Sequence, residues 1–483
     1  MMMTTRAILA LGTLLAGAAP GLAATNDVCN ASRSWVSKPS LPSFGTPPGD
    51  HCAFYQIAWQ SFLYLTSPSG GAGSAAVFET YPTVDEIFGS GGPAAPRNLK
   101  LVTITDPRTR RTRQFRPRLA KPVPRTTATG ALTFDEDQQA TSGGILVDQA
   151  GNITYYEQFL DPQAFVPFVQ ACNLTNAACQ RQPGAQSLVF PNVSMEMKVS
   201  WRPLWKTTAG YATYYRIPGF PVQNAAGQTV TPDSFGLVGF HLVYAIAGHP
   251  ELVWATFEHV ANAPDAPCVA GQKTCGALPP GMPTWAYNAC AATTCANVNV
   301  WPTPAPTTPP TTQAFRENPF GTIPSMKDAA GTSGSDNVAI IQNLNRSVVG
   351  ILPKGSVWAN YVFQGALWTT GSLPAFAPFQ GNGQPNPAFN QVGSTFLANA
   401  TMETFTQFPN PIPTPFPTNT FQNCFTCHNT ADSTQTKPPA TLAPEFLLSH
   451  AMFRASGTSC PWSTTPPSAC VATQAPASGT KRP

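Results

Sequence analysis

Charged residues are scarce in this 483-residue sequence. Only 10% of the residues are Asp, Glu, Lys or Arg, against about 25% in an average globular protein. The net charge of +4 is small, so we do not expect the chain to bind nucleic acid or an anionic membrane surface. Low charge can accompany disorder, but a hydrophobic fraction of 42% with 10 Trp predicts a packed core instead.

The sequence also lacks internal repeats, a glycine-rich phosphate loop and a serine nucleophile elbow. Nothing in it therefore points to a solenoid, a nucleotide-binding enzyme or an α/β-hydrolase. The fold and the function have to be read from strand and helix patterns, from the cysteines and from one short motif.

A long hydrophobic run is missing as well. The apolar run at residues 7–19 follows Arg6 and precedes the small residues Ala23 and Ala24, an arrangement typical of a secretory signal peptide. It is shorter than the about 20 residues that cross a bilayer, which disfavours the alternative of an N-terminal membrane anchor. We expect residues 1–24 to be a signal peptide, no integral membrane segment after its removal, and a periplasmic or secreted protein.

The twelve cysteines fit an oxidising compartment. Cys424 and Cys427 belong to a motif described below, and the remaining ten form an even number, which predicts a disulfide framework in an exported protein. Sequence alone leaves the connectivity open. A zinc site between Cys268 and Cys295 is the less favoured alternative, because its spacings differ from the close pairs that zinc prefers. Neighbours along the chain suggest five pairs: Cys29 with Cys52, Cys172 with Cys179, Cys268 with Cys275, Cys290 with Cys295, and Cys460 with Cys470.

Hydrophobic patterning predicts an α+β fold, a β-rich body with a few helices and a C-terminal segment packed on it. Asp50 is expected to cap a helix that ends before Pro68. The domains expected are an extended arm at 25–49, a main body at 50–408, a C-terminal segment at 409–460, and a tail at 461–483 that is disordered after Cys470. The other expected elements are hairpins at 145–156 and 239–260, strands at 193–201 and 357–368, and helices at 337–351, 394–405 and 445–454.

Two details of the strands bear on function. The alternation at residues 193–201 predicts a half-buried strand, on which Glu196 and Lys198 would form a solvated ion pair rather than a catalytic pair. In the second hairpin, a loop centred near Pro250 would place His241 opposite His259. That pair could form a two-histidine site or one wall of a cofactor pocket, or simply two hydrogen-bonded core histidines. A one-residue slip in register would separate them.

One motif carries specific chemistry. Residues 423–429 read Asn-Cys-Phe-Thr-Cys-His-Asn and contain C-x-x-C-H, the signature of c-type haem attachment. Two thiols one turn apart match the two haem vinyl groups, and the following histidine reaches the iron from the same side. The alternative, a redox C-x-x-C, normally follows a strand in a βαβ setting, whereas Pro-rich sequence precedes this motif. We expect one covalent haem c on Cys424, Cys427 and His428, with His428 as proximal iron ligand.

The motif lies only 55 residues from the C-terminus. So short and Pro-rich a segment offers too little structure to enclose a porphyrin, and we expect the haem to dock against the large upstream body. The distal iron ligand stays open. The candidates are His450 and Met452 downstream, Met402 upstream, the main-body residues His259, His241, Met195 and Met197, or no protein ligand at all.

The chain resembles a group of uncharacterised exported bacterial cytochrome c family proteins of similar length. The stretches that carry the resemblance are residues 58–62, 194–201, 254–259 and 402–405, besides the C-x-x-C-H motif. The resemblance implies haem binding and electron transfer but no particular substrate.

Three functions follow from these observations, in order of preference. The first is electron transfer by an exported mono-haem cytochrome with an unidentified redox partner protein. The second is a peroxidase-like enzyme with an open iron site, for which the sequence assigns no catalytic residue. The third is a non-catalytic binding or surface protein stapled by haem.

Overall fold

The computed structural model describes residues 29–70, 73–88, 102–106, 108–110, 112–117, 145–171, 190–265, 284–289, 298–302, 308–380, 382–409, 422–428 and 448–449. The expected signal peptide, the tail and most of the predicted helix at 445–454 lie outside these residues. So do eight of the twelve cysteines, and with them four of the five suggested disulfide pairs and the alternative zinc site.

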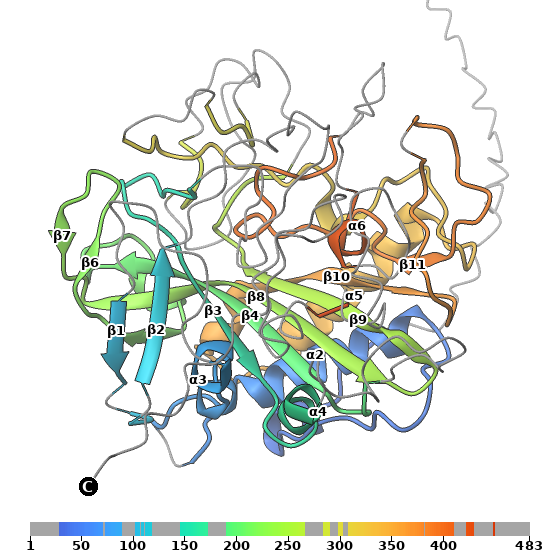
Figure 1. Ribbon diagram of the computed structural model, residues 1–483, viewed down its shortest axis with the longest axis horizontal. Coiled ribbons are helices and arrows are strands. Elements are labelled where there is room, and N and C mark those ends of the chain that lie inside the picture. Colours follow the sequence, from blue (N-terminus) through green and yellow to red (C-terminus); the bar gives the residue numbers. More distant parts are fainter. Residues whose placement is uncertain are drawn as a thin grey trace, which may run out of the picture.

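A nine-stranded antiparallel sheet forms the centre of the molecule (Figure 1). Its strands follow the order β1-β2-β3-β4-β8-β9-β10-β11, and β5 pairs with the first residues of β8 on the edge opposite β4. The prediction of a β-rich α+β fold is confirmed. The strands are β1 Val102–Thr105, β2 Thr112–Pro117, β3 Tyr155–Leu160, β4 Met195–Leu204, β5 Arg216–Pro218, β8 Ser234–Ile246, β9 His249–His259, β10 Tyr361–Thr369 and β11 Gln391–Gly393, with a separate pair β6 Val222–Gln223 and β7 Thr229–Val230.

Helices and turns cover both faces of this sheet. The helices are α1 Ser34–Ser37, α2 His51–Leu65, α3 Val84–Phe88, α4 Phe165–Ala171, α5 Gly334–Ile351 and α6 Cys424–Cys427. Short 3₁₀ helices are η1 Val77–Thr80, η2 Tyr211–Thr213, η4 Pro319–Gly321 and η5 Val357–Asn360. Helices α2 and α5 pack on one face, which we call the helix face, and α6 lies over the other, which we call the motif face (Figure 1).

The two predicted long helices are confirmed, and a capping side chain explains where each of them begins. Asp50 caps α2 by accepting a hydrogen bond from the backbone N–H of Ala53 at 2.8 Å, and Ser333 caps α5 in the same way. Aromatic rings of α2 then pack on the sheet. Phe62 stacks on Phe257 of β9 with ring centroids 4.2 Å apart, which anchors α2 over the centre of the helix face.

Strand β4 corrects one prediction. The sequence alternation indicated a half-buried strand, but every residue of β4 is buried. Met195, Met197 and Val199 belong to the core under α2. Glu196 and Lys198 lie on the motif face and are 3% and 6% exposed, so their ion pair is buried rather than solvated, because segments from elsewhere in the chain cover that face.

The hairpin of β8 and β9 corrects a second prediction. Ile246 pairs with His249 across a tight turn in which Gly248 has a φ of 82°, a conformation that glycine adopts without steric cost. The turn therefore lies at residues 247–248 rather than near Pro250, and, after a bulge between Tyr244 and Ile246, His241 pairs with Thr256 instead of His259. Because side chains alternate along a strand, His241 and His259 lie on opposite faces of the sheet.

The predicted helix at residues 394–405 is wrong: this segment forms successive turns. Asn399 explains the difference, because its side-chain oxygen accepts from both the backbone N–H and the hydroxyl of Thr401. Asn and Thr side chains compete with helical hydrogen bonding in this way. The turn at residues 399–403 lies flat on the motif face beside Gly239, where an added Cβ would meet the hydroxyl oxygens of Thr401 at 2.4 Å and Ser200 at 2.5 Å.

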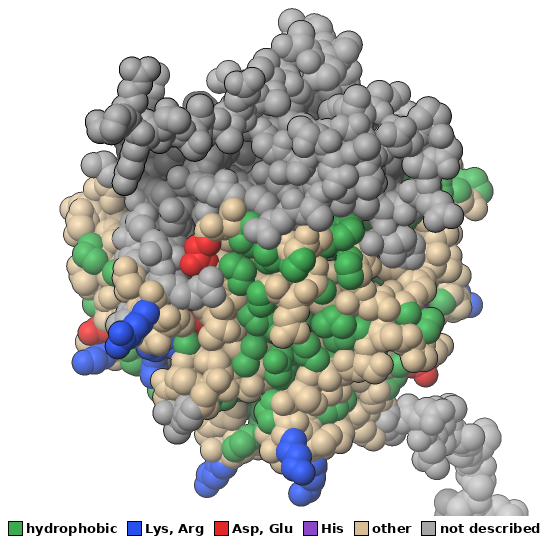
Figure 2. Space-filling model, turned by 60° about the horizontal axis from the view of Figure 1, so that its bottom comes forward, with side chains coloured by type: hydrophobic (Ala, Val, Ile, Leu, Met, Phe, Trp, Pro, Cys, Tyr) green, Lys and Arg blue, Asp and Glu red, His purple; other side chains and the backbone are tan. Residues whose placement is uncertain are grey.

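The N-terminal arm is fastened to α2 and to the turn between β8 and β9. Cys29 of the arm and Cys52 of α2 form a disulfide, the one suggested pair that falls within the described residues. The backbone N–H of Ala247 in the turn donates to the backbone carbonyl of Phe44 in the arm. The face shown in Figure 2 displays hydrophobic and uncharged polar side chains with charged ones mainly at its margins, as the low charge content predicts. None of the helices in the described part of the chain has the length and hydrophobicity that a bilayer crossing requires.

The close approach at Gly239 makes a stability prediction. Replacing Gly239 by Ala should lower the free energy of unfolding by about 1–3 kcal/mol, because the new methyl group forces the 399–403 turn away from the sheet. Urea denaturation measures the change. Gly350→Ala is the matched control: an added Cβ there meets nothing within 4 Å, so this helical substitution should leave stability equal or higher. Equal stabilities of the two variants would contradict the packing described.

Candidate functional site

The C-x-x-C-H motif forms a single helical turn, α6. Asn423 caps it: the side-chain oxygen accepts from the backbone N–H of Phe425 at 3.0 Å, and the hydroxyl of Thr426 accepts from the backbone N–H of Asn423. The backbone N–H of His428 donates to the carbonyl of Cys424 at 2.9 Å. Cys424 and Cys427 therefore stand one turn apart, and His428 follows directly.

Hydrogen bonds from the two residues before the first cysteine fasten this turn to the main body. The amide of Asn423 donates to the side chain of Gln391 at 2.5 Å and to the carbonyl of Thr395 at 2.6 Å. The side-chain nitrogen of Gln422 donates to the backbone carbonyl of Phe379, and the side-chain oxygen of Gln422 accepts from the backbone N–H of Phe379. Since both anchors are largely buried, the motif is held in a fixed place on the sheet.

Apolar side chains of the motif face lie beneath the turn. Phe425 is 1% exposed and packs edge-on to Trp254 of β9, with ring centroids 6.1 Å apart. The imidazole of His428 lies against the same indole, with centroids 4.4 Å apart. The apolar cluster around these rings includes Leu160, Phe165, Phe190, Val243, Leu252, Leu367, Leu397 and Leu448.

Next to this apolar region, a row of polar side chains crosses four strands. Strand pairing places Gln158, Lys198, His241 and Thr256 opposite one another on β3, β4, β8 and β9. We call these four residues the polar row. It lies two residues along each strand from the Val243–Trp254 pair, a step of about 7 Å.

Two carboxylates hold the polar row. Glu196 accepts hydrogen bonds from Gln158 and from the hydroxyl of Ser449, and its carboxylate lies 3.8 Å from the Lys198 ammonium. Glu403, on the 399–403 turn, lies 2.9 Å from Nε2 of His241. The polar row thus pairs one lysine and one histidine with one carboxylate each, inside the protein.

The remaining predicted ligands fall in other places. Met195 and Met197 are buried on the helix face. Met402 is fully buried in the 399–403 turn. His450 and Met452 lie outside the described residues. The structure thus brings His428 and His241 to one face and separates His259 from both.

His259 is a core histidine of the opposite face. Its ring stacks on Tyr214 with centroids 3.9 Å apart, Nδ1 accepts from the backbone N–H of Ala261, and Nε2 lies 3.3 Å from the hydroxyl of Thr213. Burial disfavours the charged imidazolium and lowers the pKa of His259 to about 3. The hydrogen-bonded core histidine weighed from the sequence is therefore what the structure shows at this position.

Sequence reasoning missed the residues that build the seat of the motif. Trp254, Asn399 and Glu403 have no distinctive spacing, and Trp254 and Glu403 entered only as part of stretches that carry the family resemblance. Asn423 directly before Cys424 is a helix-capping signal that could have been read.

The donor set fits a covalent haem. Two cysteines on one helical turn, a histidine next to them and an apolar wall of aromatic and aliphatic side chains are what such a group requires. Cys424, Cys427 and His428 would hold it. Within the described residues no cluster of three or more His, Cys, Asp and Glu side chains is found that could bind a bare metal ion.

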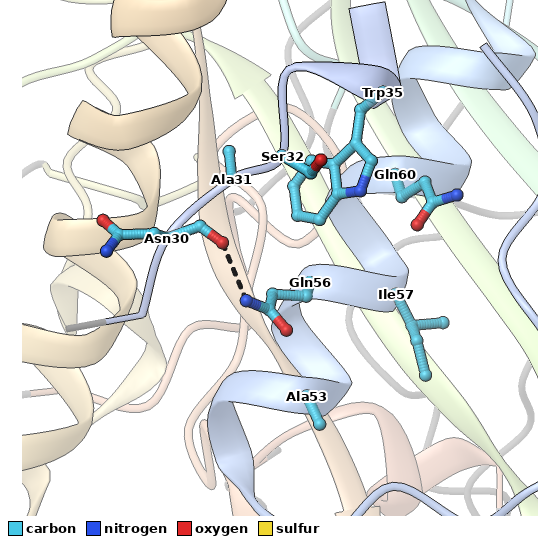
Figure 3. Close-up of a pocket in the computed structure, with 8 residues that line it drawn as sticks. All are labelled: Asn30, Ala31, Ser32, Trp35, Ala53, Gln56, Ile57 and Gln60. Atoms are coloured by element: carbon cyan, nitrogen blue, oxygen red, sulfur yellow. Dashed lines mark hydrogen bonds between the residues drawn. The ribbon is translucent and has the colours of Figure 1, made fainter. Parts of the chain in front are cut away.

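A separate groove of about 410 Å³ opens between the arm and α2, on the helix-face side of the molecule (Figure 3). Gln56 closes one side by donating to the carbonyl of Asn30 at 2.7 Å, and Trp35 and Ile57 line it. It shares no residue with the motif face.

Comparison with known proteins adds no relative: no family model matches the chain, and neither a curated protein nor a solved structure shows significant similarity to it.

The depressed pKa of His259 predicts a pH dependence of stability. In the unfolded chain His259 has an ordinary pKa near 6.5 and is protonated below that pH, whereas in the folded protein it stays neutral down to about pH 3. The contribution of His259 to the free energy of unfolding is therefore complete above pH 6.5 and is lost as the pH falls. Lowering the pH from 7.5 to 5 should therefore reduce the free energy of unfolding by about 2 kcal/mol through this group.

His259→Gln should remove that part of the acid sensitivity. Urea denaturation of both proteins at pH 7.5 and pH 5 measures it, and each protein's value at pH 7.5 serves as its own control for the general effect of the substitution. The same pH slope in both proteins would show that His259 is not held neutral in the fold.

Proposed function

We propose that the chain is an exported mono-haem c-type cytochrome, which transfers electrons through a haem attached to Cys424 and Cys427 with His428 as proximal ligand. The observation that carries this proposal is the attachment of the C-x-x-C-H turn to the sheet. A chance motif in a loop would have no need of the four anchoring hydrogen bonds from Gln422 and Asn423.

The protein's own residues have defined tasks in this proposal. The cap at Asn423 fixes the helical turn that sets the two cysteines one turn apart. Trp254 restricts the rotation of the His428 ring and keeps it on one side of the turn. Phe425, Leu367 and Leu448 exclude water from the motif face. A bound haem supplies reversible one-electron chemistry, and its potential depends on axial ligands and burial.

A second candidate is a haem enzyme that binds a small molecule at an open iron site. The polar row favours it, because Lys198 and His241 are groups that can donate or accept protons beside the motif. Carbon monoxide separates the two functions, since an iron with two protein ligands resists it and an open iron binds it.

The covalent attachment is tested with cysteine variants. The full chain is produced with a c-type maturation system, and haem that survives denaturing electrophoresis is stained in the gel. The wild type should stain at its full mass and Cys424→Ala/Cys427→Ala should not, because both thioether bonds are lost. Cys29→Ser/Cys52→Ser removes two cysteines far from the motif and should keep the stain. Covalent haem in the Cys424/Cys427 double variant would refute the proposal.

A further inference from the structure

The polar row contains one residue that is suited to bind the iron from the second side. His241 shares the motif face with Trp254, and the two are diagonal neighbours on paired strands, since His241 pairs with Thr256 and Trp254 is two residues earlier. Diagonal neighbours are about 7–8 Å apart. His428 packs directly on Trp254, so the same indole lies beside the motif histidine and one diagonal step from His241.

Most other Met and His side chains in the described part of the chain are excluded as iron ligands by their position. Met195 and Met197 lie on the helix face, and His259 has both ring nitrogens engaged there. His51 belongs to α2 and pairs with Asp328. His249 pairs with Glu251 at 2.9 Å and contacts Phe54 of α2. Two residues besides His241 remain near the motif face: Lys198 in the polar row and Met402 in the turn.

Glu403 prepares His241 for the task of a ligand. Its Oε1 lies 2.9 Å from Nε2 of His241, and its Oε2 accepts from the backbone N–H of Asn399 at 2.7 Å, so the carboxylate is fixed. A proton on Nε2 that is donated to Glu403 leaves the lone pair on Nδ1. Metal-binding histidines are commonly oriented by a carboxylate in this way, which also raises their basicity.

Accessibility distinguishes His241 from its competitors. The side chains of His241 and Glu403 are 13% and 29% exposed, whereas Met402 and His259 are fully buried and the side chain of Lys198 is 7% exposed. A residue that binds the haem iron has to present its donor atom to a large planar group, and among these candidate ligands His241 is the most exposed.

We propose that His241, oriented by Glu403, is the second axial ligand of the haem, so that the iron has two histidine ligands. This inference rests on the proposed function. It makes the protein an electron carrier with a closed iron site rather than an enzyme.

The test compares purified holoproteins. Wild type should give a low-spin ferric spectrum and should not bind carbon monoxide in the ferrous state. His241→Ala should keep its covalent haem on a denaturing gel but become high-spin and bind carbon monoxide. His241→Met, which keeps a possible ligand and fills the site, should stay folded and show a higher midpoint potential than wild type, because methionine stabilises the ferrous state.

Three control variants test whether another residue is the second iron ligand. His259→Ala, Met402→Leu and Lys198→Met should each keep the low-spin spectrum. Glu403→Gln should also keep it but raise the midpoint potential, because an amide makes the imidazole less basic than a carboxylate does.

Four results would overturn the proposal. They are carbon monoxide binding by wild type, an unchanged spectrum and potential in both His241 variants, loss of the low-spin spectrum in one of the three controls, and a wild type without covalent haem. The last is recognised on the gel and refutes the proposed function as well, whereas the first three leave covalent attachment intact.

Discussion

The contact between His428 and Trp254 links the motif to the sheet, and the arrangement of the motif face depends on it. A C-x-x-C-H turn in a loop would have no defined surroundings. Here His428 and Phe425 of the turn both pack on the indole of Trp254. Asn423, directly before the turn, donates a hydrogen bond to Gln391 of the main body. The rest of the motif face, apolar near Trp254 and polar one step along the strands, then surrounds the motif.

Burial of the sheet on both faces has a cost that the structure meets with hydrogen bonds. The side chains of Lys198 and Thr256 are buried and that of His241 is 13% exposed, and a buried polar group without a partner costs about 1–3 kcal/mol. The 399–403 turn supplies partners to two of them: Glu403 to His241 and Asn399 to Thr256. Gly239 allows this turn to approach the sheet closely, so a single small residue helps to position the polar row.

The sequence predicted what local rules determine. Caps and hydrophobic spacing predicted α2 and α5, β-rich runs predicted β4, β8, β9 and β10, and the nearest-neighbour pairing of Cys29 with Cys52 is confirmed. The errors have different origins. Burial of β4 on both faces depends on segments from elsewhere in the chain that pack on the sheet. The hairpin turn at Gly248, which leaves His241 opposite Thr256, and the Asn399 hydrogen bonds in the turns at 394–405 are local features that hydrophobic spacing alone does not reveal.

The candidate site divides in the same way. The residues of the motif follow from its spacing, whereas Trp254 becomes a functional candidate only through strand register, and Asn399 and Glu403 only through the packing of their turn on the sheet. A one-residue difference in register moves every side chain of a strand to the other face, so the partner of His241 could not be derived from sequence. For the same reason His259, a reasonable ligand by residue type, lies in the core on the opposite face of the sheet.

A fragment tests most directly whether the motif turn and the sheet form one site. Residues 410–483, exported with maturation machinery, contain the motif but lack Phe379, Gln391, Thr395 and Trp254, which hold it in the full chain. The fragment should attach haem covalently yet show mixed axial ligation in its ferric spectrum and rapid proteolysis, while the full chain shows one defined ligation state. A compact, protease-resistant fragment with the spectrum of the full chain would contradict the account and make the C-terminus a separate cytochrome domain.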